Sequence, residues 1–88
     1  MITQFALGHV VTTPGAFSTF PPEFLASSLV RHARGDWGDL DAEDKAANEA
    51  ELRTGGRLLS VYELGVERLY IITEHDRSAT TLLLPSEY

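Results

Sequence analysis

The sequence predicts a small α+β domain in the order β-α-α-β-β-β, with a four-stranded, mainly antiparallel sheet and helices packed on one face. Four short runs alternate in the way that strands do, and two segments after the first run have apolar residues at helical spacing. Glycine and proline clusters separate these runs. With 88 residues, of which 43% are hydrophobic, the chain is expected to form one domain, residues 1–88.

The first strand is expected over residues 4–12, where both faces of the alternating run are at least partly apolar. A short helical turn should follow, because Thr13 can cap it and Pro14 loses no needed hydrogen bond at the first helical position. The Phe-Pro-Pro at residues 20–22 limits this turn by forcing the chain to be extended again.

Two helices are expected next. The first covers residues 22–34 and is ended by Gly35. Its expected apolar side consists of Leu25, Ala26, Leu29, Val30 and Ala33. The second begins at Asp41, a good capping residue, and stops at the Thr-Gly-Gly of residues 54–56. Its expected inner face is made only of alanines, namely Ala42, Ala46, Ala47 and Ala50.

The remainder predicts a meander of three antiparallel strands. Residues 57–64 and 67–74 alternate, and Gly65 stands first in the two-residue loop between them, which suits a type II′ hairpin turn. A longer turn over residues 75–78 leads to a third strand at residues 79–84, closed by Pro85.

The net charge of −6 lies in one stretch, residues 36–51, which contains seven acidic residues and a single basic residue, Lys45. This acidic face favours a basic partner, since complementary charge steers association. A solvated helix with well-placed N-terminal charges is the alternative. The predicted partner-binding residues are Asp36, Trp37, Asp39, Asp41, Glu43, Asp44, Asn48 and Glu51. Within this set Trp37 is either an exposed anchor or a buried core residue.

Composition excludes several function classes. A pI of about 4.8 argues against direct nucleic-acid binding and against anionic membranes. Because the chain has no cysteine, no basic leader-like start and no long apolar run, we expect a cytoplasmic protein with no membrane contact.

We expect no metal site and no cofactor. Residues 36–44 lack the central glycine and the terminal glutamate of a calcium loop. His9, His32 and His75 have no metal-ligand spacing, so each is expected to be structural or on the surface. The polar residues 74–81 would offer His75 as a base and Ser78 or a threonine as a nucleophile, but a hydrogen-bonded turn is the favoured interpretation. We therefore predict no catalytic residue.

Several strings of the chain resemble a widespread, uncharacterised group of small proteins carried on bacterial plasmids, phages and integrative elements. They are Leu7-Gly8 with Val10-Val11, Thr13-Pro14-Gly15-Ala16, Gly35-Asp36-Trp37-Gly38, Arg57-Leu58-Leu59-Ser60 with Tyr62, Ile72-Thr73-Glu74 with Asp76-Arg77-Ser78, and Thr80-Thr81 with Leu83-Leu84-Pro85 and Glu87-Tyr88. Some members are labelled plasmid-related proteins. Others carry a restriction-modification subunit label, which does not fit this length.

The resemblance implies a setting and no catalytic residue. Small acidic proteins of mobile elements include anti-restriction and anti-CRISPR inhibitors that compete with nucleic acid for a basic groove. The first hypothesis is therefore a non-enzymatic inhibitor that binds a nuclease or CRISPR effector through the acidic face. The second is a homo-oligomeric assembly factor, such as a homodimer paired through a sheet edge or the alanine face. The third is a small enzyme that uses residues 74–81.

Overall fold

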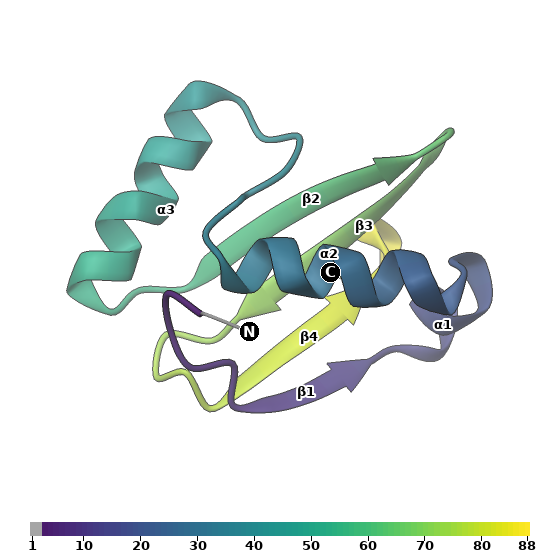
Figure 1. Ribbon diagram of the computed structural model, residues 1–88, viewed down its shortest axis with the longest axis horizontal. Helices are drawn as coiled ribbons and strands as arrows, with labels where there is room; N and C mark the ends of the chain where they lie inside the picture. Colours follow the sequence, from purple (N-terminus) through teal and green to yellow (C-terminus); the bar gives the residue numbers. More distant parts are fainter. Residues whose placement is uncertain (1–2) are drawn as a thin grey trace.

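The computed structural model describes residues 3–88. Met1 and Ile2, which belong to the segment used for the expectation about a leader, lie outside the described residues. It contains a four-stranded sheet with the strand order β1-β4-β3-β2 (Figure 1). The elements are β1 (His9–Thr12), α1 (Pro14–Thr19), α2 (Pro22–Ala33), α3 (Ala42–Thr54), β2 (Leu58–Leu64), β3 (Glu67–Thr73), β4 (Ala79–Leu83) and the 3-10 turn η1 (Pro85–Glu87).

The α+β class is confirmed, and the sheet is mixed. Strands β2, β3 and β4 form the expected antiparallel meander, whereas β1 runs parallel to β4. The β2–β3 turn has Gly65 at a φ of 62°, the positive value that the first position of a type II′ turn requires. Two of the three strand pairings are thus antiparallel, and the long path through the helices returns the chain for the parallel one.

Strand β1 is shorter than predicted because the chain before it leaves the sheet. Gly8 adopts a left-handed φ of 66°, and a Cβ there would lie 2.4 Å from the Ser78 backbone. The Gln4 amide donates to the carbonyl of Ala33, so residues 4–7 turn toward the end of α2. Only His9–Thr12 remain in the ladder.

Helices α1 and α2 cover one face of the sheet, and the core lies between these helices and the sheet (Figure 1). Its buried residues are Ala16, Phe20, Leu25, Tyr62, Leu69, Ile71 and Leu82. The Thr13 hydroxyl caps α1 by accepting from the Ala16 amide, as expected. The predicted apolar side of α2 needs a correction, because Ala26 is exposed while Ser28 and His32 are buried. The Ser60 and Thr73 hydroxyls of the sheet bond the His32 ring, which accounts for its burial.

Helix α3 lies beside the β2 edge instead of on the sheet face (Figure 1). Asp41 caps it and Gly55 ends it in a left-handed conformation, both as predicted. The expected alanine inner face is wrong for three of its four members: Ala42, Ala46 and Ala47 are exposed, Ala50 is half-buried, and Asn48 is the buried residue. A helix that docks on the edge of a sheet meets backbone groups, which an amide can bond and an alanine cannot.

Candidate partner-binding surface

The acidic loop between α2 and α3 runs along the outer edge of β2. Gly38 forms a parallel bridge with Val61, the Asp39 amide donates to the Val61 carbonyl at 2.7 Å, and the Val61 amide donates to the Trp37 carbonyl at 3.3 Å. Only glycine fits at position 38, because its φ is 77° and a Cβ would lie 2.0 Å from the Val61 oxygen. The loop therefore acts as a short extra strand.

Two polar side chains complete the closure of this edge. Asn48 donates to the Leu59 carbonyl at 2.7 Å and accepts from the Leu59 amide at 3.2 Å, while Asp39 accepts from the Glu63 amide at 3.0 Å. Unpaired edge groups invite other strands, and here the chain covers them itself. Asn48 is buried and Asp39 is bonded at the edge, so both predicted partner-binding residues hold the fold together.

Trp37 is a core residue, with only 3% of its surface exposed. Its ring stacks on Phe5 at 6.1 Å between centroids and meets the His32 ring edge-on at 5.7 Å. The indole N–H donates to Glu49 at 2.7 Å, which satisfies its one donor. Of the two interpretations of Trp37, the structure matches the buried one, so this side chain is not an accessible anchor.

Asp36 and Asp41 also have local structural partners. Asp36 forms a two-point ion pair with Arg31, at 2.7 and 3.2 Å, and accepts from the Gly38 amide at 3.2 Å. The Arg31 hydrogen bond, followed by the Gly38 amide, holds the pKa of the Asp36 carboxyl below its usual value. Asp41 accepts from the Asp44 amide at 2.8 Å as the helix cap.

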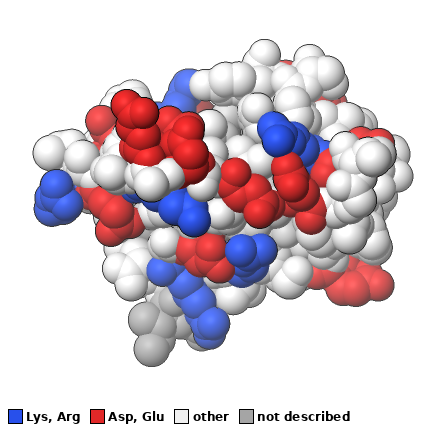
Figure 2. Space-filling model, turned by 90° about the horizontal axis from the view of Figure 1, so that it is seen from above, with Lys and Arg blue, Asp and Glu red and all other residues white. Residues whose placement is uncertain are grey.

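The side-chain carboxylates of three predicted acids form no hydrogen bond or ion pair with residues 3–88, although the Asp44 amide and the Glu51 carbonyl are bonded through the main chain. These are Glu43, Asp44 and Glu51, all exposed on α3. Acidic side chains gather on the face drawn in Figure 2, with Lys and Arg side chains between them. The acidic stretch thus divides into carboxylates that build the fold and carboxylates that face solvent.

A buried polar chain crosses the layer between α2 and the sheet, and it was not predicted. The His32 ring contacts the Ser60 hydroxyl through Nδ1 at 2.5 Å and the Thr73 hydroxyl through Nε2 at 2.8 Å. Thr73 meets Thr80 at 2.7 Å, and Thr80 donates to the Leu7 carbonyl at 2.7 Å. Because these partners lie on separate strands, no local sequence signal joins them.

The end of this chain fixes the direction of its protons as far as Nε2 of His32. The Leu7 carbonyl can only accept, so Thr80 donates to it, Thr73 donates to Thr80, and His32 donates from Nε2 to Thr73. In the neutral ring that burial favours, Nδ1 of His32 accepts from Ser60. Burial lowers the pKa of His32 to about 4, consistent with that neutral state.

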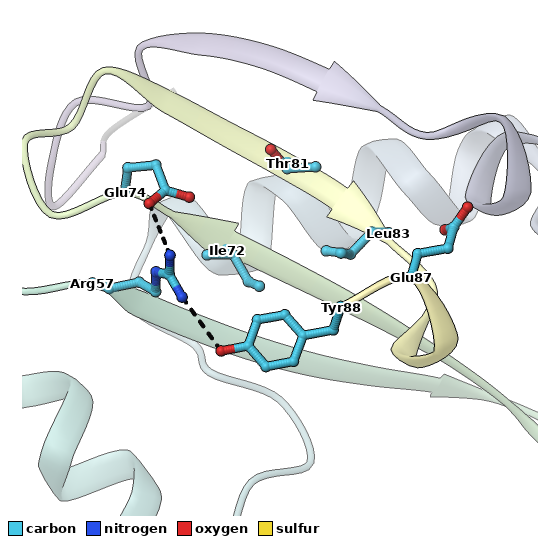
Figure 3. Close-up of a pocket in the computed structure, with 7 residues that line it drawn as sticks. All are labelled: Arg57, Ile72, Glu74, Thr81, Leu83, Glu87 and Tyr88. Carbon is cyan, nitrogen blue, oxygen red and sulfur yellow. Dashed lines mark hydrogen bonds and ion pairs between the residues drawn. The ribbon is translucent and has the colours of Figure 1, made fainter.

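Of the polar residues 74–81, residues 75–78 form a hydrogen-bonded turn and residues 79–81 belong to β4. Asp76 accepts from the Ser78 amide at 3.0 Å, and His75 and Ser78 are exposed. A nearby pocket of about 310 Å³ lies on the sheet face opposite α2 (Figure 3). It is lined by Arg57, Ile72, Glu74, Thr81, Leu83, Glu87 and Tyr88.

Three polar side chains of this pocket bond to one another. Arg57 pairs with Glu74 at 3.2 Å and donates to the Tyr88 hydroxyl at 3.4 Å, as the dashed lines of Figure 3 mark. His75, Ser78 and Thr80 are not among the lining residues, so the imidazole expected as the base does not reach the pocket. Of the threonines in residues 74–81, Thr81 lines the pocket and Thr80 is buried in the His32 chain.

Within residues 3–88, no three His, Asp or Glu side chains come together as a possible metal site. No helix in that range has the length and apolar character needed to cross a bilayer. No known protein family, curated protein or solved structure matches this chain. The role of the candidate surface is therefore inferred from its own geometry.

Proposed function

We propose that this chain is a non-enzymatic protein of a mobile element. It docks the acidic surface of α3, formed by Glu43, Asp44 and Glu51 and here named the acidic α3 edge, on the basic surface of a nucleic-acid-handling protein. A nuclease or a CRISPR effector is the kind of partner meant, and inhibition of host defence is the role. The same proposal places the protein in the cytoplasm, where such partners act. It needs no cofactor and no direct contact with nucleic acid.

The observation that carries the proposal is the poor packing of α3. Asn48 is the buried residue of this 13-residue helix, while Glu43, Asp44 and Glu51 are exposed and their carboxylates form no hydrogen bond or ion pair with residues 3–88. The helix is held by its two caps, by Asn48 and by the Trp37–Glu49 contact. A helix attached at these few points presents solvent-facing carboxylates, and such a concentration of negative charge steers association with a basic surface.

The division of the acids decides how the proposal can be tested. Replacing Asp36, Asp39 or Asp41 would remove an ion pair, an edge bond or a helix cap, so a loss of binding would be ambiguous. Glu43 and Glu51 have no such role, and Glu43→Gln/Glu51→Gln removes two charges from the α3 side. Glu23→Gln/Glu67→Gln is the matched control, because it removes two exposed acids outside the acidic stretch.

The experiment is affinity capture from a bacterial lysate with three baits: the wild-type chain and the two double variants. We expect nucleic-acid-binding proteins to be retained by the wild type and the control at low salt, released at high salt, and depleted on the α3 variant. Equal recovery on both double variants, or recovery of the bait alone, would contradict the proposal.

A small enzyme built on residues 74–81 has less support. The pocket near this turn is lined by the Thr81 hydroxyl but not by the His75 imidazole, which was the expected base, and the Glu74 carboxylate in it is paired with Arg57. The homo-oligomeric alternative is supported by the β1 edge of the sheet, opposite the β2 edge beside α3.

A further inference from the structure

The two edges of the sheet are treated differently by the chain. The β2 edge is closed by Trp37, Asp39 and Asn48, as described above. At the other edge, the amides of His9 and Thr13 donate inward to Ser78 and Leu82, at 2.9 and 3.0 Å. Because inward and outward groups alternate along a strand, the N–H and C=O of Val10 and Thr12 point outward. Nothing in residues 3–88 forms a hydrogen bond with those four groups.

Strand β1 also lacks the usual protection of an edge strand. Natural edges carry charges, prolines or bulges, and none of these occurs in the His-Val-Val-Thr of β1. Val10 and Val11 are each 42% exposed, and Phe17 on the adjoining α1 is 69% exposed. Residues 3–22 contain no Asp, Glu, Lys or Arg. This edge is thus uncharged, partly apolar and unpaired.

We propose that β1 pairs with β1 of a second copy, antiparallel about a two-fold axis at Val11, to form a continuous eight-stranded sheet. In this register Val10 lies opposite Thr12 of the second copy, and Thr12 lies opposite its Val10. All the outward N–H and C=O groups of both strands are then used. The two Val11 side chains lie directly opposite each other, at the close spacing of a non-hydrogen-bonded pair.

The distribution of charge favours a second copy as the occupant. Each chain carries −6, which would oppose self-association if the acidic residues met. The acidic stretch of residues 36–51 lies instead around α3, beyond the β2 end of the sheet, while β1 forms the opposite end (Figure 1). Near β1, the Glu87 carboxylate bonds the Thr13 hydroxyl just beyond the strand. Pairing through β1 therefore joins two strands without acidic or basic residues and leaves the acidic stretches far apart. It also leaves α3 free, so this inference stands independently of the proposed function.

The test is sedimentation of the full chain from about 1 μM to about 1 mM, a range that brackets weak and transient complexes. We expect a concentration-dependent dimer. Val11→Lys places like charges opposite each other and should raise the dimer Kd at least about tenfold. Val11→Thr keeps a β-branched side chain without charge, so this control should dimerise like the wild type.

A mixing experiment tests the register itself. Val11→Lys and Val11→Glu should each be monomeric alone, and an equimolar mixture should form a heterodimer, because the two positions face each other. Circular dichroism checks that each variant is folded, as expected for a side chain that is 42% exposed. A wild-type chain that stays monomeric to about 1 mM would overturn the proposal. So would a dimer that Val11→Lys leaves unchanged, or a folded mixture that does not associate.

Discussion

Asn48 of α3 bonds both backbone groups of Leu59 on β2, donating to its carbonyl at 2.7 Å and accepting from its amide at 3.2 Å. At Leu59, where no neighbouring strand lies beside β2, one side-chain amide thus makes the two hydrogen bonds that a strand would make. The bond explains how a helix with an exposed alanine side stays attached to the domain. It also fixes the orientation in which Glu43, Asp44 and Glu51 face solvent.

Asn48→Ala should lower the free energy of unfolding by about 2 kcal/mol, because two hydrogen bonds are lost and the Leu59 groups are left unpaired. Urea unfolding measures the change, and hydrogen exchange should show a faster Leu59 amide. Ala47→Asn adds the same side chain at an exposed neighbouring position and should change stability by about 0.5 kcal/mol or less. An Asn48→Ala variant as stable as the wild type would show that the edge contact is dispensable.

The buried imidazole of His32 makes stability depend on pH. Its folded pKa of about 4 lies below its ordinary 6.5, so the unfolded chain binds more protons between these values. The contribution of His32 is therefore fully present above about pH 6.5 and is lost as pH falls toward 4, by about 3 kcal/mol in total.

Two measurements separate His32 from the carboxylates. The stability difference between pH 7 and about pH 5 should be about 2 kcal/mol smaller in His32→Gln than in the wild type. In the folded wild-type chain, NMR should show the His32 ring titrating near pH 4. A midpoint near 6.5 would mean that the ring is not held neutral by burial.

The Trp37–Glu49 hydrogen bond should contribute about 1 kcal/mol to the attachment of α3. A double-mutant cycle isolates this bond from the volume lost in Trp37→Phe. The unfolding free energies of Trp37→Phe, Glu49→Ala and the double variant should deviate from additivity by about that amount. Additive effects would show that the Trp37–Glu49 hydrogen bond does not stabilise the fold.

The locally determined features of the fold were predictable from the sequence. The Thr13 and Asp41 caps, the glycine that ends α3 and the Gly65 turn depend on neighbouring residues, and the structure has all of them. The parallel β1–β4 pairing depends on the path of the whole chain, which alternation in single strands does not encode.

The candidate site was predictable in composition and not in detail. The sequence places the acids in one stretch. Which polar side chains of that stretch form hydrogen bonds within the fold depends on non-local partners such as Val61, Glu63 and Leu59. Helical spacing assigns Ala46 to the interior of α3 because it counts only apolar residues, whereas the β2 edge selects Asn48. The burial of Trp37 likewise involves stacking on Phe5, which lies far from it in sequence.

Displacement of nucleic acid from a captured partner tests the central claim most directly. With a labelled oligonucleotide bound to the purified partner, the wild-type chain should release the label as its concentration rises. Glu43→Gln/Glu51→Gln should require about five- to tenfold more protein for half-release, and Glu23→Gln/Glu67→Gln should match the wild type. A ternary complex that retains the oligonucleotide, or equal curves for the two double variants, would contradict docking of the acidic α3 edge on a nucleic-acid-binding surface.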